Sequence, residues 1–451
     1  MSEAESEAGQ AGGMRRARIA AAVAAAGLFA AVAVVLALTT PWNPLPGHVP
    51  GGRVEPGPAL DFSPSEIARS KAFDSAINPP AYTGLVVGLV VILALGFTPL
   101  GARFIGWVTA RTPRRLLRII VATVALTTLL RVAGLPFDIW SESVLRRYGL
   151  STQSWPAWFV DQLKSLGVTW VIYTIALLLL YGVVRRFPRY WWTGADTGGF
   201  LLVVLVSFIY PIAVEPVFNK FHSLPQGQLR TDLLAMAERD GVPVDDVLVA
   251  DASRRTTSLN AYVSGFGSTR RIVLYDTLLK SPPARVESIV AHELGHAKRD
   301  DVLYGTLVGA LGIAGAMCLL YLLMTSPRLL SRAGVASTGP PERRSGGAAD
   351  PRSIALVLAL VAAGTQIGAP VQNLVSRRIE ARADAHALNL TRDPATFVSM
   401  QHELSVRNIS DLNPDAMEYL LWLTHPSGPD RIAMARSWAR MHHVQEPPPL
   451  R

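Results

Sequence analysis

The feature that most limits the fold of this chain is a series of seven long apolar runs. A helix needs about 20 residues to cross a bilayer, and each run has that length or nearly so. The runs lie at about residues 19–38, 82–100, 116–135, 166–184, 197–214, 303–324 and 354–373. Half of the residues are hydrophobic and only 17% are charged, which is too apolar for an ordinary soluble enzyme of this length. We therefore expect an all-α multi-span protein of the cell membrane, with about seven transmembrane helices.

The apolar runs and the polar stretches between them divide the chain into five parts. The first run is expected to be a retained span, because no small-residue cleavage site follows it and further spans do. A polar, Gly- or Pro-rich composition predicts disorder at the amino terminus and between the last two runs. The expected parts are a disordered polar tail at 1–18, five spans within 19–214, a soluble insert at 215–302, two further spans within 303–374 around a disordered linker at 325–353, and a helical carboxyl-terminal region at 375–451.

The charge distribution favours a membrane over a nucleic acid as the partner. The formal net charge is +9, but the basic residues form short clusters between the apolar runs instead of one stripe. Arginines at the ends of membrane spans account for this pattern. The single cysteine, Cys318, lies inside an apolar run and is expected to be a core residue, and no intrachain disulfide can form.

The soluble insert at 215–302 predicts a small α+β unit. The segment "QLRTDLLAMAERDGV" has a helical pattern that Gly241 is suited to end. The segments "DDVLVADAS", "LNAYVSGFG" and "RRIVLYDTL" are typical of two or three strands. A further helix follows, with proline at its start and the sequence "AHELGH" within it.

This "HELGH" sequence predicts a metal site. Residues four apart share a helix face, so His292 and His296 can hold one metal ion. Neutral imidazoles suit Zn²⁺, and a catalytic zinc site keeps its fourth position for water. Glu293 follows the first histidine and can take a proton from that water without being a ligand. The pattern therefore predicts one zinc ion per chain and hydrolytic chemistry.

A zinc hydrolase needs a third protein ligand, and "NLVSRRIEARADAHALNL" offers a candidate. Glu380 could complete the ligand set, and Asp384, one turn later, could accept the free ring N–H of a ligating histidine. An ordinary solvated helix face is the other interpretation, because the segment is also a normal ladder of charges. His386 is a competing ligand, but its place in the helix points it elsewhere. The residues alone favour the ordinary solvated helix face.

Beyond the zinc motif, the chain resembles the integral-membrane CaaX prenyl protease 1 family, which are zinc endopeptidases. The segments that carry the resemblance cover roughly residues 80–440 and occur in the family's order between the spans. They are "GLPFDIW…YGLSTQSWPAWFVDQLKS", "YPIAVEPVFNKFHSLPQGQLR", "SLNAYVSGFGSTRRIVLYDTLL", "HELGH", "NLVSRRIEARADAHAL" and "THPSGPDRI". The residues before about 80 match only in having a first span.

The resemblance implies a role for each residue of the metal site. His292, His296 and Glu380 match the family's zinc ligands, and Glu293 matches its catalytic acid/base. Asp384 matches the carboxylate that steadies a ligand histidine. This matching favours Glu380 as a ligand over the plain charge ladder.

The resemblance also implies residues that contact the substrate. Asn260 and Ala261 match the strand that lines the cleft, where an extended substrate is expected to add as a further strand. His425 matches a histidine that contacts the scissile carbonyl, and Arg431 matches a basic partner nearby. Taken alone, His425 could equally be a helix-capping residue before Pro426.

The expected function is a membrane-embedded zinc metalloendopeptidase that cleaves peptides or membrane proteins. Eukaryotic members of the family act on proteins with a lipid-modified C-terminal cysteine and usually have two prolines after the late histidine. Here Pro426 and Ser427 follow it, so the substrate stays open. One alternative is a site-2-type intramembrane protease, to whose second motif "LNPDA" at 412–416 is a partial match. Another is a non-catalytic membrane scaffold that retains the protease fold.

The orientation in the membrane is the last expectation, and two arguments conflict. Seven spans place the amino terminus opposite the catalytic insert. Near the span ends, sixteen Lys and Arg residues lie on the amino-terminal side and twelve on the catalytic side, and the positive-inside rule then favours an external site. The family resemblance implies a cytoplasmic site, and an insert without cysteine agrees with that. We expect the active site to face the cytoplasm.

Overall fold

Seven long apolar helices form most of the molecule, as the sequence predicts. The structure, a computed structural model, describes residues 3–265, 267–336 and 347–451. Among these residues, seven helical segments are long and apolar enough to cross a membrane, and each contains all or most of one of the predicted runs. They are Gly12–Thr39, Pro64–Phe97, Arg115–Arg147, Trp155–Arg186, Trp191–Phe218, Asp301–Met324 and Pro351–Thr391, and the predicted run at 82–100 extends three residues past the end of its helix. The predicted fold class is confirmed.

The elements follow one another in the order expected for spans interrupted by an α+β insert. The helices before the insert are α1 (Glu3–Thr39), α2 (Pro58–Asp61), α3 (Pro64–Phe97), α4 (Pro99–Val108), α5 (Arg115–Arg147), α6 (Trp155–Arg186), α7 (Trp191–Ile209) and α8 (Glu215–Phe218). The insert contains β1 (Phe221–Ser223), α9 (Gln228–Asp240), β2 (Asp246–Ala250), β3 (Ala261–Ser264), β4 (Arg271–Tyr275) and α10 (Pro283–Lys298). After it come α11 (Asp301–Met324), α12 (Pro327–Arg332), α13 (Ile354–Thr391), α14 (Pro394–Asn408), α15 (Ala416–Leu421) and α16 (Gly428–Met441).

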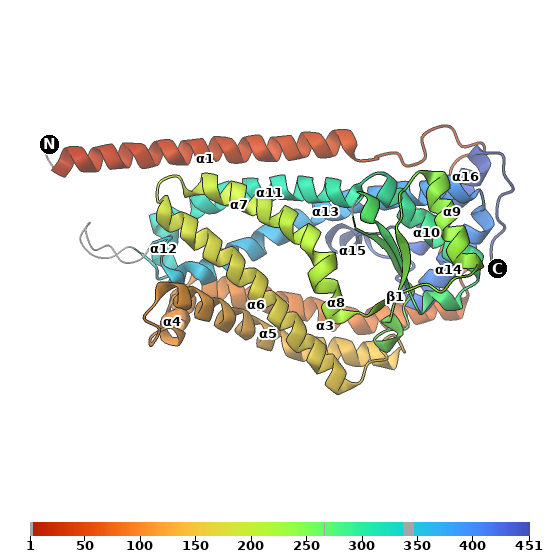
Figure 1. Cartoon of the computed structure of the whole chain (residues 1–451), viewed down its shortest axis with the longest axis horizontal. Coiled ribbons are helices and arrows are strands. Elements are labelled where there is room, and N and C mark those ends of the chain that lie inside the picture. The colour runs from red at the N-terminus through yellow and green to blue at the C-terminus, as the bar shows by residue number, and fades with distance from the viewer. Residues whose placement is uncertain (1–2, 266, 337–346) are drawn as a thin grey trace.

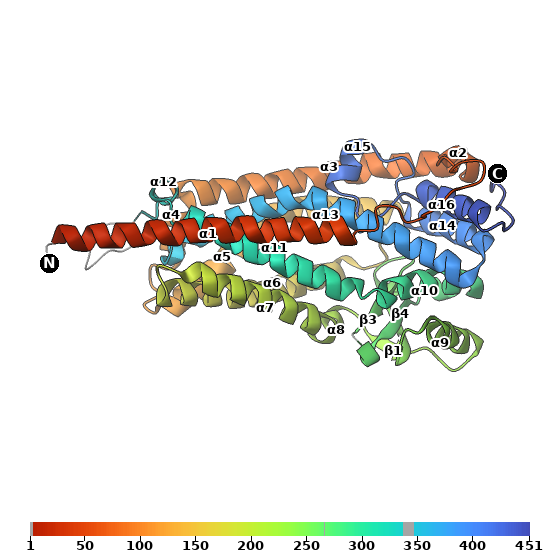
Figure 2. The same ribbon diagram turned by 90° about the horizontal axis from the view of Figure 1, so that it is seen from above.

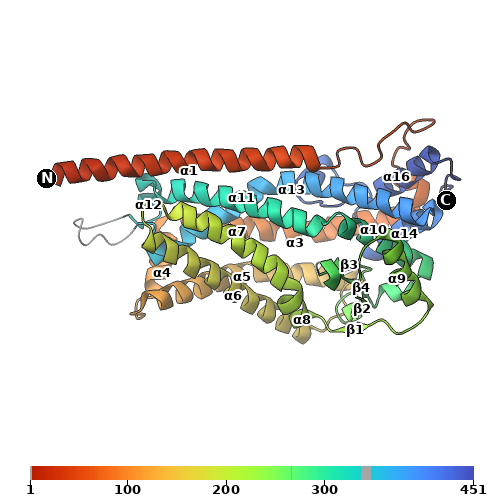
Figure 3. The same cartoon turned by 45° about the horizontal axis from the view of Figure 1, so that its top comes forward.

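The long helices run side by side, and the insert lies at one end of them (Figure 1). The start of α1, together with α4 and α12, lies at the opposite end from the sheet, α10, α14, α16 and the carboxyl terminus (Figure 1). Figures 2 and 3 show α1 lying along the outside of α11. The amino terminus and the insert are therefore at opposite ends of the helix bundle, as seven spans require.

The insert carries a four-stranded sheet with the order β1-β2-β4-β3. β2 and β4 are parallel, whereas β1 and β3 pair antiparallel with their neighbours. β2, β3 and β4 lie in the three segments for which the sequence predicts two or three strands, and β1 is an addition. Because β3 ends the order, it is an edge strand, and its outer side carries main-chain groups that another strand could pair with.

Three boundaries differ from those expected. Helix α1 begins at Glu3, within the stretch 1–18 that was expected to be disordered. The expected linker at 325–353 contains α12 and the buried side chain of Val335, while residues 337–346 lie outside the described part. Helix α13 runs without a break from Ile354 to Thr391, across the boundary expected at 374/375. Composition marks where apolar residues end, but a helix continues as long as its hydrogen bonds and packing allow.

Two large clusters of buried apolar side chains hold the molecule together, beside a third of only four residues. One lies among the spans and includes Leu126, Tyr181 and Tyr321. The other lies in the insert and the carboxyl-terminal helices and includes Leu294 and Trp438. The second cluster packs α10 against α13, α14 and α16, which brings together residues from widely separated parts of the sequence.

Candidate metal centre and active site

Helix α10 places His292 and His296 of the "HELGH" sequence on the side that faces Glu380 of α13. Proline occupies the first turn, as expected, and both His292 and His296 point away from bulk solvent. Gly295 allows the close approach of the two helices, because a Cβ atom at this position would lie 3.0 Å from the Cβ of His386. A larger residue here would separate α10 from α13.

Three potential ligand atoms converge between these helices. His292 Nε2 lies 3.2 Å from His296 Nε2 and 3.2 Å from Glu380 Oε2, and His296 Nε2 lies 3.6 Å from Glu380 Oε1. All three residues lie within a group whose ligand atoms are at most 4.8 Å apart. Around a tetrahedral zinc ion with bonds of roughly 2.1 Å, ligand atoms are roughly 3.4 Å apart. The separations, together with two nitrogens and one carboxylate, therefore fit a zinc ion.

Each histidine is held by a carboxylate at its other ring nitrogen. His292 Nδ1 lies 2.8 Å from Asp384 Oδ1, and His296 Nδ1 lies 2.9 Å from Asp301 Oδ2. An Nδ1–H that donates to a carboxylate leaves the Nε2 lone pair free for a metal. When neither Nε2 carries a proton, both atoms can thus act as acceptors toward one cation, and they lie 3.2 Å apart.

Each of these carboxylates also pairs with an arginine. Arg431 Nε donates to Asp384 Oδ2 at 2.8 Å, and both side chains are buried. Arg382 pairs with Asp301. Arg431 therefore lies behind His292, although it also lines the smaller of the two cavities described below. Sequence reasoning missed Asp301. It lies five residues after His296, at the start of the next helix, where a turn must bring it back toward the histidine.

Glu293 is next to the three candidate ligands but is not one of them. Its side chain lines both cavities that meet at the metal site. Burial raises the pKa of Glu293 above the usual range of a glutamate, although His292 and His296 lower it in part. A carboxylate with a raised pKa is better matched to proton transfer near neutral pH.

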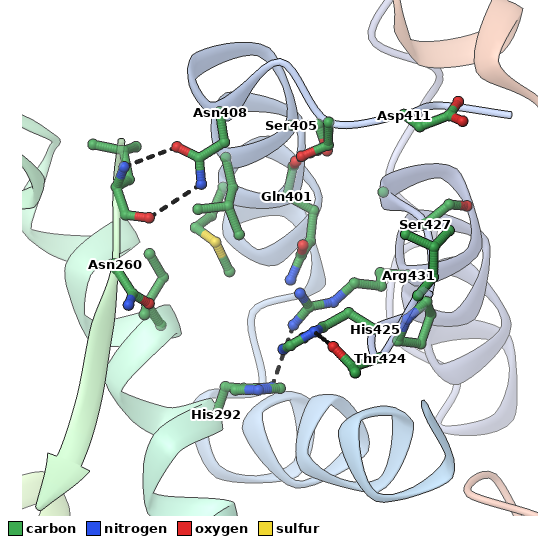
Figure 4. Close-up of a pocket in the computed structure, with 18 of the residues that line it drawn as sticks. Asn260, His292, Gln401, Ser405, Asn408, Asp411, Thr424, His425, Ser427 and Arg431 are labelled. Atoms are coloured by element: carbon green, nitrogen blue, oxygen red, sulfur yellow. Dashed lines mark hydrogen bonds between the residues drawn. The ribbon is translucent and has the colours of Figure 1, made fainter. Parts of the chain in front are cut away.

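His425 lies in the segment between α15 and α16. Its Nε2 is 3.4 Å from Glu380 Oε1, and its side chain is 60% exposed. The hydroxyl of Thr424 lies 2.9 Å from His425 Nδ1. His425 is thus beside the metal group, with one face open to a bound molecule (Figure 4). Ser427 forms the N-cap of α16 with a hydrogen-bond pair to Asp430.

Two cavities meet at this site. The smaller, of about 450 Å³, extends toward α14 and is the one drawn in Figure 4. The larger, of about 960 Å³, extends between α1, α11 and α13. The residues that line both cavities are Asn260, Ala261, His292, Glu293 and His425. The edge strand β3 therefore passes from one cavity to the other beside His292, His296 and Glu380.

Two residues considered from the sequence lie away from the ligand group. His386 Nε2 is 2.9 Å from Asp240 Oδ2, between α13 and α9. Asp415, the aspartate of "LNPDA", caps α15 by accepting from Glu418 N–H at 2.8 Å. Helix α10 is also absent from the candidate spans of the described residues. None of these features agrees with a site-2-type centre, whose metal helix is itself a span.

Comparisons with known proteins agree with this geometry. The model of "Peptidase family M48" matches residues 223–439, and the model "CAAX prenyl protease N-terminal, five membrane helices" matches residues 80–220. The protein "Uncharacterized metalloprotease YhfN" of Bacillus subtilis is 29% identical over 394 residues, which cover 87% of this chain and 90% of that protein. The "CAAX prenyl protease 1 homolog" of Oryza sativa is 30% identical over 316 residues, which cover 67% and 69%.

A solved structure shows the same fold. The crystal structure of S. mikatae Ste24p matches with a TM-score of 0.74 and 20% identity, and it covers 92% of this chain and 98% of that chain. The two family models together leave unmatched mainly the first 79 residues and the short carboxyl-terminal end. The chain therefore belongs to the CAAX prenyl protease 1 family of M48 peptidases and is a multi-pass membrane metalloprotease.

Proposed function

We propose that this protein is a zinc endopeptidase that cleaves peptides or membrane proteins at the site between its two cavities. The observation that carries the proposal is the convergence of His292, His296 and Glu380, with Glu293 and the free edge of β3 beside them. Two imidazoles and one carboxylate with an open fourth position are the ligand set of catalytic zinc in hydrolases. Such zinc supplies Lewis-acid activation of water at neutral pH.

Different residues of the site have different roles in hydrolysis. An extended substrate pairs with the outer edge of β3, near Asn260 and Ala261, which places a carbonyl beside the metal ligands. Glu293 takes the proton of the attacking water and later delivers it to the leaving amine. His425 donates a hydrogen bond to the oxygen that becomes negative. Asp384 and Arg431 hold the ring of His292 and thus act through it.

The walls of the larger cavity favour apolar substrate segments. They include Phe29, Val32 and Leu36 of α1 and several glycines of α11. We propose that the site accepts an extended peptide with apolar side chains in this space, and that it does not require a lipid-modified terminus. The Ala-, Gly- and Arg-rich composition is typical of bacterial proteins, in which such lipidated substrates are not expected.

The central experiment is the Glu293→Gln variant. Without the carboxylate that moves the proton, cleavage of casein in detergent should be abolished, whereas one zinc per chain should remain by elemental analysis. Glu287→Gln, on the same helix but outside both cavities, is the matched control and should keep both. Turnover by Glu293→Gln near the wild-type rate would remove Glu293 from the mechanism, and a wild-type protein without zinc or cleavage would refute the function.

We further propose that the active site faces the cytoplasm. The test is cysteine labelling in intact cells in a Cys318→Ala background. Gln226→Cys lies exposed in the insert, and Ala110→Cys lies exposed in the turn after α4, at the opposite end. A membrane-impermeant maleimide should modify the Ala110→Cys variant and should not modify the Gln226→Cys variant. The reverse pattern would show that the count of basic residues gives the correct orientation.

A further inference from the structure

One position of the edge strand is already occupied by a side chain. At the end of α14, the amide of Asn408 pairs with the main chain of Leu259, just before β3 (Figure 4). Leu259 N–H donates to Asn408 Oδ1 at 2.9 Å, and Asn408 Nδ2 donates to the Leu259 carbonyl at 3.1 Å. An asparagine amide offers the same donor and acceptor as a peptide unit. Asn408 therefore takes the place that one residue of an added strand would occupy.

The alternation of the strand shows which positions remain for a substrate. The carbonyl of Asn260 accepts from Tyr275 N–H at 3.1 Å, so Asn260 faces β4. In an antiparallel pair, successive residues point their main-chain groups alternately toward the partner and away from it. Leu259, Ala261 and Val263 thus face the outer edge. Because Asn408 already pairs with Leu259, a substrate strand on the outer edge can pair only from Ala261 onward.

The position of Asn408 is fixed by the turn that ends α14. Ile409, the next residue, has a φ of 49°, a left-handed conformation that is strained for a β-branched side chain. Ile409 is buried in a small apolar cluster with Phe73 of α3, Val144 of α5 and Leu150, which follows α5. Packing therefore holds the strained turn in place, and backbone strain of this kind gathers at functional sites.

We infer that Asn408 is a positioning residue that ends substrate pairing at Ala261 and so fixes which peptide bond reaches the metal site. This inference rests on the proposed peptidase function. Side chains on a strand repeat every two residues, so a bound strand can slip only by two residues without turning its faces over. An open edge at Leu259, which lines the smaller cavity, would allow that slip. The amide of Asn408 blocks it.

The first test replaces Asn408 and maps the products. The substrate is a casein peptide that the wild-type enzyme cleaves at one major bond, and products are identified by mass spectrometry. Asn408→Ala should add cleavage at the bond two residues away, while zinc content stays at one per chain. Asn408→Asp keeps the acceptor for Leu259 N–H but loses the donor, and it should show the same second product to a smaller extent. Asn389→Ala, an exposed asparagine on α13 outside both cavities, is the matched control.

The second test needs no variant of the enzyme. In a series of peptides, each main-chain nitrogen of the substrate is methylated in turn, and kcat/KM is measured with the wild-type protein. Loss of one strand hydrogen bond should lower kcat/KM by roughly threefold to tenfold. Two sensitive positions, two residues apart, are expected to correspond to Ala261 and Val263, and the position two residues further on the Leu259 side should tolerate methylation.

The outcomes separate this inference from the proposed function. A wild-type enzyme that does not cleave, or cleavage that survives Glu293→Gln, would refute the function itself. Normal cleavage with an unchanged product pattern in Asn408→Ala would refute the positioning role, and so would a third methylation-sensitive position in the same register. A lowered rate with unchanged cleavage positions in both Asn408 variants would reduce Asn408 to a structural link between α14 and the sheet.

Discussion

Removing the negative charge of Asp384 should weaken zinc binding and destabilise the protein through two separate effects. Asp384 is fully buried; its Oδ1 lies 2.8 Å from His292 Nδ1, and its Oδ2 accepts from Arg431 Nε at 2.8 Å. An amide offers one oxygen where the carboxylate offers two, so in Asp384→Asn one of these two donors faces an NH₂ group. The arginine, with a side chain only 10% exposed, then lacks its counter-charge.

The magnitudes follow from these two contacts. Breaking a buried ion pair by removing one partner costs about 3–5 kcal/mol, so the thermal midpoint of Asp384→Asn should fall by several degrees. Loss of the carboxylate that orients a metal-ligating histidine costs about 10–100-fold in metal affinity. The double variant Asp384→Asn/Arg431→Gln removes both charges. It should recover most of the stability but keep the lowered zinc affinity, because His292 still lacks its carboxylate.

Zinc titration with a competing chelator and thermal unfolding of the detergent-solubilised protein measure the two effects. Asp240→Asn is the matched control, because Asp240 is also a buried aspartate, paired with His386 and Lys298 away from the metal group. Its zinc affinity should equal that of the wild type. If Asp384→Asn kept the zinc affinity and the midpoint of the wild type, the assignment of Asp384 to His292 and Arg431 would be wrong.

Three further predictions concern the same site. Glu380→Ala should lose zinc outright by elemental analysis, because it removes one of three ligands; a variant with one bound zinc would contradict this. His425→Ala should keep zinc but lower kcat by roughly 10²–10³-fold, as loss of an oxyanion donor does, and a kcat within twofold of wild type would exclude that role. Burial lowers the pKa of His296, but hydrogen bonds to Asp301 and Glu380 raise it to about 10. Zinc must therefore displace a proton that is bound below that pH, and the affinity measured by chelator competition should fall about tenfold per pH unit for each proton displaced as the pH falls from 8 to 6. An affinity independent of pH would show that the ring is already neutral.

The sequence by itself determined the membrane class and most of the metal chemistry. Spans are long, continuous apolar segments, and a bilayer imposes their length, so composition alone locates them. The spacing of His292 and His296 is likewise local, because one helix turn sets which residues share a face. The three longer strands of the insert were found for the same reason, since a two-residue alternation is written in a few neighbouring residues.

The proposed third ligand, Glu380, could be predicted only in part from the sequence. Glu380 could not be told from an ordinary charged helix face by its own neighbours, and only the resemblance to a family favoured it. What sets it apart physically is the packing of α13 against α10, which Gly295 permits and which brings Glu380 Oε2 to 3.2 Å from His292 Nε2. Such a contact joins residues 88 positions apart, and no local pattern encodes it.

Only the tertiary structure decided how the site is supported and how its edge is closed. Asp301 reaches His296 because α11 begins immediately after a tight turn at Asp300, a residue with a left-handed φ of 51°. Asn408 reaches Leu259 across 149 residues, because the packing of Ile409 fixes the end of α14 beside β3. These contacts depend on where whole helices meet, and that depends on the burial of apolar surface from many segments at once. The local sequence therefore identifies the residues of the candidate site, and long-range packing determines their positions relative to one another.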